Sequence, residues 1–133
     1  MTEVETAWLA GLLEGEGTFF LNRNIVGGKL YLYPLVAVAM IDRDVIWRAA
    51  ELFGTKCLDG AKCKSGKPYF RAVATGKRAI GIMRAIRPLM GERRGTKIDS
   101  LLVDWEARPA PNVLRSTTLK STLKEKQIFS RPV

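Results

Sequence analysis

The chain has 133 residues, of which 47% are hydrophobic and 26% charged, and its formal net charge is +9 at pH 7. This length suits one domain with a single core. No apolar run is long enough to span a bilayer and the N-terminus lacks a secretory signal pattern, so we expect a soluble intracellular protein, from a bacterial or phage-infected cytoplasm or from an organelle. The absence of histidine excludes histidine-dependent acid-base and triad chemistry.

The charge is distributed unevenly along the chain. The first sixteen residues hold four acidic residues and no basic one, whereas residues 56–97 hold twelve Lys and Arg against Asp59 and Glu92. Such a segment indicates a polyanionic partner, most simply a nucleic acid, and a merely solvated basic surface is the alternative. Membrane binding is not expected, because no lysine-rich amphipathic helix with a bulky apolar face is present.

Cys57 and Cys63 are the only cysteines. Without histidine they cannot supply the roughly four nitrogen or sulfur ligands of a structural zinc site. We expect both to be reduced packing residues, with a disulfide as the minor alternative.

The N-terminal segment is predicted to be a helix with an unusual composition. Thr2 and Glu5 have the spacing of a capping box. Apolar residues cover most of the helix circumference, which predicts burial on nearly all sides. Gly11 and Gly15 each cost about 1 kcal/mol relative to alanine inside a helix. Because a spacing of four places them on one face, together with Ala7 they predict close packing of a second helix.

Glu14 and Glu16 fall at the predicted C-terminal end of this helix. The helix dipole makes a carboxylate there unfavourable by roughly 0.3 to 1 kcal/mol. Their position suggests that a cation is bound nearby.

The rest of the chain alternates between strand and helix patterns. Gly27-Gly28 and Ser65-Gly66 are predicted hairpin turns, and Pro34 predicts a bulge or an edge within its strand. The predicted elements are strands 18–26 and 29–41, helix 42–54, strands 55–64 and 67–75, helix 77–90, and a last helix that begins near Thr96 and stops before Pro109.

Residues 9–17, LAGLLEGEG, closely resemble the LAGLIDADG signature of homing endonucleases, with Glu14 and Glu16 in place of its two aspartates. The predicted elements also follow the αββαββα order of that family. The resemblance implies an α+β fold in which a curved antiparallel four-stranded sheet carries its helices on one face and residues 1–108 form one endonuclease domain. Residues 109–133 form a basic C-terminal extension, either a flexible DNA-backbone arm or one more helix.

The resemblance also implies an activity, the hydrolysis of phosphodiesters in both strands of a double-stranded DNA target with Mg²⁺ or another divalent cation such as Mn²⁺. Glu16 would be the catalytic, metal-binding carboxylate, because a carboxylate is a hard oxygen ligand. Glu14 would serve the helix end, with a role as second ligand less favoured. Lys97 and Arg93 would stabilise the transition state, followed by Arg94, and plain phosphate contact is the alternative.

A chain with one motif must pair with itself to cut both strands. The resemblance implies a homodimer that packs through Ala7, Gly11 and Gly15 of the motif helix around a two-fold axis. Its target would be a palindrome or near-palindrome.

The sheet is expected to lie in the DNA major groove. Alternation places Asn22 and Asn24 on the face of Thr18 and Phe20, where asparagine suits adenine edges, whereas lysines are expected to contact phosphates. The residues expected to contact DNA are Asn22, Asn24, Tyr31, Tyr33, Lys62, Lys64, Lys67, Tyr69, Arg71 and Arg94.

One departure from the family argues against cleavage. The polar residue that typically orients the water has no match, because residues 38–41 are apolar, and Asp42 is the nearest candidate. The alternative is a non-catalytic protein of the same fold, either a maturase that binds intron RNA or a DNA-binding regulator. A third hypothesis is an unrelated RNA-associated protein. The carboxylate at Glu16 favours a nuclease encoded by an intron or mobile element.

Overall fold

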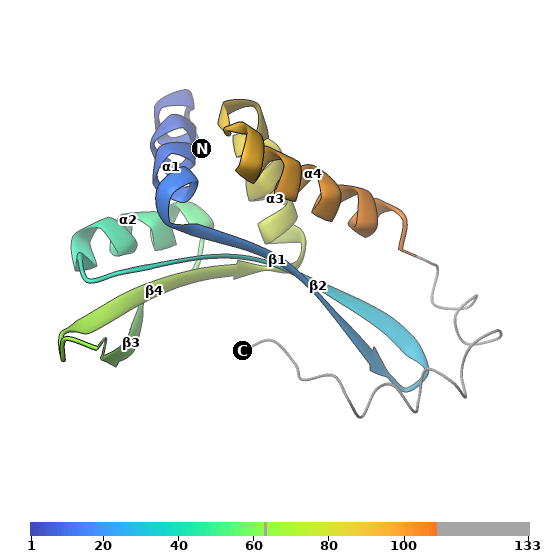
Figure 1. The fold of residues 1–133 in the computed structure, drawn as a ribbon, viewed down its shortest axis with the longest axis horizontal. Helices are drawn as coiled ribbons and strands as arrows, with labels where there is room; N and C mark the ends of the chain where they lie inside the picture. Colours follow the sequence, from blue (N-terminus) through green and yellow to red (C-terminus); the bar gives the residue numbers. More distant parts are fainter. Residues whose placement is uncertain (63, 109–133) are drawn as a thin grey trace.

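The computed structural model describes residues 1–62 and 64–108. In this part of the chain, four strands form one antiparallel sheet, and the helices lie on one side of it (Figure 1). The strands lie in the order β1-β2-β4-β3. The elements in chain order are α1 (Glu3–Glu16), β1 (Gly17–Val26), β2 (Lys29–Met40), α2 (Arg43–Phe53), β3 (Leu58–Lys62), β4 (Pro68–Thr75), α3 (Gly76–Ile86), the 3-10 helix η1 (Arg87–Leu89) and α4 (Glu92–Glu106). The predicted α+β class and the αββαββα order are both confirmed.

Two predictions fall partly or wholly outside the described residues. Cys63 and the C-terminal extension, residues 109–133, are not among them. Cys57 is a free thiol that is half-buried and packs against the core, as expected of a packing residue. No helix among the described residues is both long and apolar enough to cross a membrane.

The ends of the first two helices follow local rules closely. Thr2 and Glu5 form the predicted capping box, with Thr2 Oγ1 accepting from the Glu5 N–H at 3.1 Å and Glu5 Oε1 accepting from the Thr2 N–H at 2.8 Å. Gly54 ends α2 in the left-handed region at φ 75°, which favours glycine. Asp42 is the N-cap of α2 by position, but its side chain makes no capping hydrogen bond.

The hairpin of β1 and β2 has the predicted turn and no bulge. Gly27 and Gly28 have positive φ values of 59° and 80°, as a tight two-residue turn requires. The pairing of β1 with β2 is continuous through Pro34, whereas β2 pairs with β4 only from Leu35 onward. Pro34 therefore lies where β2 is an edge strand, so its missing N–H costs no ladder bond to β4.

The two C-terminal helices differ from the prediction in their bounds. Helix α3 ends at Ile86, and the chain continues as a 3-10 turn that contains Pro88. Proline cannot continue the α-helical hydrogen-bond ladder, which explains the early end. Helix α4 begins at Glu92 rather than near Thr96. The basic residues expected before the last helix therefore lie in its first turns.

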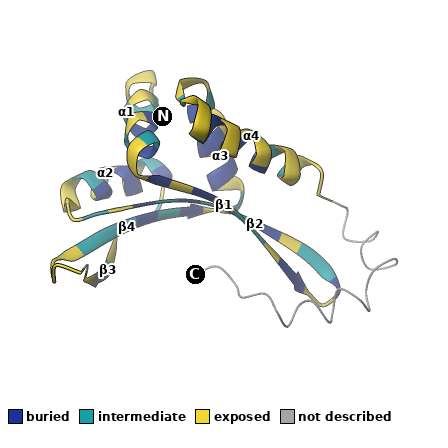
Figure 2. Ribbon diagram, viewed as in Figure 1, coloured by how far each residue is buried: buried dark blue, intermediate teal, exposed yellow. Residues whose placement is uncertain are grey.

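The core lies between the sheet and the helices, and Figure 2 shows buried positions on the helix sides that face the sheet. The sheet contributes Phe19, Val36, Val38, Ala72 and Ala74, and the helices contribute residues that include Leu9, Leu13, Ile46, Phe53, Met83, Ile86 and Ile98. The prediction that the first helix is buried on nearly all sides is wrong for the single chain. Only Leu9, Ala10 and Leu13 of α1 are buried, and Val4 is 74% exposed.

Candidate active site and nucleic-acid interface

Helix α1 passes into strand β1 without a loop, at Gly17. This residue is extended, at φ −79° and ψ 153°, and its N–H donates to the Leu13 carbonyl oxygen. A Cβ at Gly17 would lie 2.7 Å from the same oxygen, closer than real side chains come. Position 17 therefore requires glycine, because the backbone of Leu13 lies too close to leave room for a side chain. The junction places the exposed Glu16 at the rim of the sheet.

Replacing Gly17 by alanine is expected to lower the free energy of unfolding by about 1 to 3 kcal/mol, because the chain must shift to relieve the contact. Urea denaturation measures this. Gly81→Ala is the matched control, since Gly81 lies within α3 and its added Cβ meets nothing within 4 Å. The control is expected to stabilise the protein by up to about 1 kcal/mol. Equal stability of Gly17→Ala and wild type would contradict the packing argument.

Two hydrogen bonds join the start of α4 to the end of α1. The Gly91 N–H, at the N-cap of α4, donates to Glu14 Oε1, and Arg94 Nη1 donates to the Gly17 carbonyl oxygen. Glu14 thereby satisfies a free N–H at a helix N-terminus, where the helix dipole favours a carboxylate. This contact agrees with the structural role expected for Glu14. Arg94 is half-buried in this contact, and its interaction with DNA stays a prediction.

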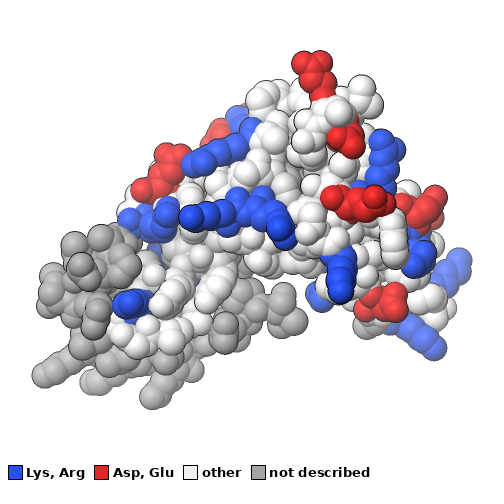
Figure 3. Space-filling view, turned by 180° about the vertical axis from the view of Figure 1, so that it is seen from behind, with Lys and Arg blue, Asp and Glu red and all other residues white. Residues whose placement is uncertain are grey.

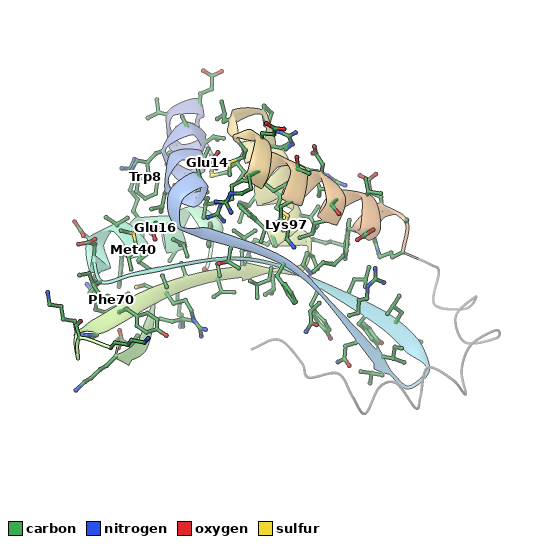
Figure 4. All side chains as sticks on the ribbon, viewed as in Figure 1. Trp8, Glu14, Glu16, Met40, Phe70 and Lys97 are labelled. Carbon is green, nitrogen blue, oxygen red and sulfur yellow. The ribbon has the colours of Figure 1, made fainter. Side chains whose placement is uncertain are left out.

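Arg93 and Lys97 lie beside the same junction. Figure 4 shows Glu14 and Glu16 at the end of α1 and Lys97 on the neighbouring α4. A hollow of about 630 Å³ lies between the start of β1 and α4. It is lined by Gly17, Thr18, Phe19, Arg93, Arg94, Thr96, Lys97 and Ser100. Both Arg93 and Lys97 are exposed, and neither forms an ion pair with a described residue.

Ser100 and Asp104 were not predicted as site residues. They line a second hollow of about 140 Å³ together with Lys97, Phe20 and Arg23. Lys97, Ser100 and Asp104 are spaced by three and four, so they share one face of α4. Helical spacing was the signal that could have identified them.

Six of the strand residues expected to contact DNA share one face of the sheet, and these are Asn22, Asn24, Tyr31, Tyr33, Tyr69 and Arg71. Lys62 of β3 pairs with Pro68 instead, which places it on the other face. Opposite residues in antiparallel strands project to the same side, and Asn22 pairs with Tyr33, Asn24 with Tyr31. Along β2 this face continues through Ala39, which pairs with Arg71 of β4. The rings of Tyr31 and Tyr33 stack, with centroids 6.5 Å apart.

Asn24 departs from the prediction. It is only 3% exposed, so its amide does not lie on an open surface ready to contact a base. Alternation correctly assigns the direction of this side chain but cannot report what packs around it. Tyr69 and Arg71 are half-buried on the same sheet face, at its far end.

The lysines expected to contact phosphates lie at the far end of the second hairpin. Lys62 ends β3, and Lys64 and Lys67 flank the turn at Gly66; all three are exposed. In Figure 3, Lys and Arg side chains form a row across the middle of the face that is seen from behind, and acidic side chains lie above this row and to one side of it.

Some basic side chains are already paired with acids. Arg84 contacts Glu106 at 2.9 Å, and Arg87 makes a two-pronged pair with Asp99 at 2.6 and 2.7 Å. The hydrogen bond from Arg87 holds the pKa of the Asp99 carboxyl below its ordinary value. The basic groups of α3 and η1 are thus partly neutralised, unlike those at the start of α4.

The expected dimer residues lie on an exposed face of α1. Ala7, Gly11 and Gly15 are exposed, and a Cβ added at either glycine meets nothing within 4 Å. Ala7 borders a hollow of about 580 Å³ that is also lined by Ala85, Pro88 and Leu89. Close packing among the described residues of a single chain therefore does not require glycine at positions 11 and 15.

The expected water-orienting position has no clear replacement. Ile41 is 50% exposed and Asp42 is exposed at the start of α2. Nearby, the Arg43 guanidinium lies over the Trp47 ring, 4.6 Å from the ring centroid. The centroid of the Phe70 ring lies 6.0 Å from the same guanidinium. Sequence reasoning did not find this arginine and aromatic group, whose members come from α2 and β4.

No protein-family model and no curated protein matches this sequence. Solved structures do match. They include the homing endonuclease I-CvuI in complex with the I-CreI target, at a TM-score of 0.58 and 14% identity over 93% of this chain and 76% of that one. I-TnaI matches with a TM-score of 0.57 and 13% identity, over 96% and 89% of the two chains.

A third match is the LAGLIDADG homing endonuclease I-GzeII in complex with its DNA target. Its TM-score is 0.53 at 12% identity, and the match covers 96% of this chain but 52% of that one. The fold and the junction therefore define a class of protein in which helices cover one face of an antiparallel sheet and a carboxylate lies at the end of the first helix. This chain has the LAGLIDADG homing endonuclease fold, as the motif predicts.

Proposed function

We propose that this chain is a site-specific DNA endonuclease that acts as a homodimer and cuts both strands of a long palindromic or near-palindromic target. The observation that carries the proposal is the position of Glu16, an exposed carboxylate at the α1 and β1 junction, next to a hollow lined by Arg93 and Lys97. Phosphodiester hydrolysis uses such groups, a carboxylate to hold metal and cations to offset charge on the phosphate.

Glu16 fits a hard divalent cation, Mg²⁺ or Mn²⁺, as one ligand among several. The described residues contain no group of three or more side chains that could hold a metal ion. The other ligands would then be water, phosphate oxygens and Glu16 of the partner subunit. When bound, such an ion activates water and neutralises charge on the phosphate. Structures of I-CvuI in the presence of Mg or Ca support divalent cation use.

Arg93 and Lys97 would act on the scissile phosphate directly. They are one helical turn apart near the N-terminus of α4, so both cations and the helix dipole present positive charge to the hollow. Glu14 is less suited to a second ligand role, because its Oε1 already accepts the Gly91 N–H.

The homodimer would form through α1. The exposed stripe of Val4, Ala7, Gly11 and Gly15 is apolar or without side chains, so a second copy of α1 can approach its backbone closely. The match to about half of I-GzeII is what one unit of a two-part enzyme would give.

DNA would lie against the sheet face opposite the helices. Asn22, Tyr31, Tyr33, Tyr69 and Arg71 are the proposed base-reading residues on that face. Lys62, Lys64 and Lys67 would contact phosphates and contribute to affinity without reading sequence.

A non-catalytic nucleic-acid-binding protein of the same fold, an intron RNA maturase or a DNA-binding regulator, is the second candidate. The apolar segment that ends β2, where a polar water-orienting residue is expected, is the observation that favours it. Sequence-selective binding without cleavage would be its signature.

Cleavage of a randomised duplex library, in Mg²⁺ and in excess chelator, tests the proposal. We expect double-strand cuts at one set of related sequences when Mg²⁺ is present and no cuts when the chelator is in excess. A parallel selection for bound duplexes and for bound RNA separates the candidates. Selective DNA binding without cuts in either Mg²⁺ or Mn²⁺ would overturn the nuclease assignment, and selective RNA binding alone would favour the maturase.

A further inference from the structure

The sheet face opposite the helices has an apolar centre. Phe20 of β1 pairs with Leu35 of β2, and Ala37 of β2 pairs with Val73 of β4. The exposed Thr18 and Thr75 pair with Ala37 and Leu35 and border this group. Since paired residues project to one side, Phe20, Leu35, Ala37 and Val73 lie together. Phe20 is 47% exposed and the other three are half-buried. The helices lie on the other side of the sheet (Figure 1), and Phe20, on the edge strand β1, also borders the smaller hollow beside α4.

Polar groups flank this apolar centre on both sides. Asn22 and Tyr33 follow it toward the first hairpin turn, and Arg71 and Tyr69 follow it toward the second. Exposed lysines continue beyond Tyr69 in the β3 and β4 hairpin. A partner of this face must therefore offer an apolar stretch between polar and negatively charged ones. Duplex DNA meets that requirement in its major groove, between its phosphate strands.

Apolar side chains neither donate nor accept hydrogen bonds. Of the four bases, only thymine presents an apolar group in the major groove, its C5 methyl. A guanine or cytosine edge against Phe20 and Leu35 would instead lose water from its polar atoms without a replacement partner.

We infer that the centre of the sheet selects thymine by packing Phe20, Leu35, Ala37 and Val73 against C5 methyl groups. Each half-site then contains thymine between the positions read by Asn22 and Tyr33 and those read by Arg71 and Tyr69. This inference rests on the proposed function, in which this face binds the major groove.

The test uses the full chain and duplexes selected from a random library for binding. We expect thymine at central positions of each half-site. Replacing one such thymine by deoxyuridine removes only the methyl group and should weaken binding about fourfold. The same replacement elsewhere in the site should have little effect. A cytosine at a central position should gain affinity when replaced by 5-methylcytosine.

Protein variants identify the side chain responsible. Phe20→Ala should reduce the discrimination between thymine and uracil at the central positions and leave selectivity elsewhere unchanged. Phe20→Asn should shift the preference toward adenine, whose edge asparagine can bind. Val103→Ala, an exposed apolar position of α4, is the control. The uracil experiment with wild-type protein decides the matter even where a variant fails to fold.

Equal affinity for thymine and uracil duplexes, or a selected site without central thymine, would overturn the inference and leave the proposed function intact. A selection that yields no preferred DNA sequence would overturn the proposed DNA recognition itself.

Discussion

Replacing Glu16 with glutamine is expected to abolish double-strand cleavage while DNA binding persists. Glutamine keeps the size of the side chain and removes the charge that holds a divalent ion. Because a metal contributes several kcal/mol to stabilising charge on a phosphate, and each 1.36 kcal/mol is tenfold, the rate should fall by about a thousandfold or more. Single-turnover cleavage of a selected target in Mg²⁺, with binding measured beside it in Ca²⁺, gives both quantities.

Glu16→Asp is the matched control for this experiment. It keeps the charge and shortens the side chain by one methylene, so substantial activity should remain. Both variants should unfold at the wild-type urea concentration, because Glu16 is exposed and makes no ion pair among the described residues. Wild-type cleavage by Glu16→Gln would remove Glu16 from the chemistry. Loss of binding and cleavage together would instead make it a DNA contact.

Replacing Gly11 with leucine is expected to convert a homodimer to a monomer without unfolding the chain. Gly11 is exposed and a Cβ added there meets nothing within 4 Å in the described chain, so the chain itself should accept the substitution while a helix packed on this face is displaced. Overpacking costs about 1 to 3 kcal/mol at each of the two symmetric positions, so dimerisation should weaken by at least about thirtyfold. Sedimentation equilibrium, with and without DNA, measures the mass. Cleavage of both strands should be lost with the dimer.

Gly11→Ala and Gly81→Ala separate packing from helix propensity. Alanine favours a helix over glycine by about 1 kcal/mol, so both variants should stabilise an isolated chain. Only Gly11→Ala should weaken the dimer, because Gly81 lies on α3 and is not part of the exposed stripe of α1. A wild-type mass of one chain, both free and bound to DNA, would reject the homodimer.

These two experiments address separate parts of the site. Glu16 tests the chemistry, and Gly11 tests whether two such carboxylates meet. A dimer that binds DNA selectively and lacks activity with either Glu16 or Asp at that position would match the non-catalytic candidate. In that event the apolar end of β2 would account for the missing activity.

Much of the fold could be predicted because local rules decide it. The Thr2 capping box, the turn at Gly27 and Gly28, and the end of α2 at Gly54 each depend on a few adjacent residues, and each was predicted correctly. The start of α4 was not, because the segment before Thr96 contains two glycines and no side-chain N-cap. The stabilising contact at Gly91 comes from Glu14, distant in sequence.

The sequence by itself determined the motif, the order of elements, the basic character and the strand face that Asn22 shares with Thr18 and Phe20. The strand register, which only the structure gives, adds Tyr33 and Arg71 to that face. Hydrophobic periodicity and turn preferences depend on residues that are close together in the sequence, so they can be recognised without the structure. Only the tertiary structure decided that Arg94 is directed to the Gly17 carbonyl, that Asn24 is buried, and that one face of α1 is left uncovered. Each depends on contacts between segments far apart in the chain, which no local pattern specifies.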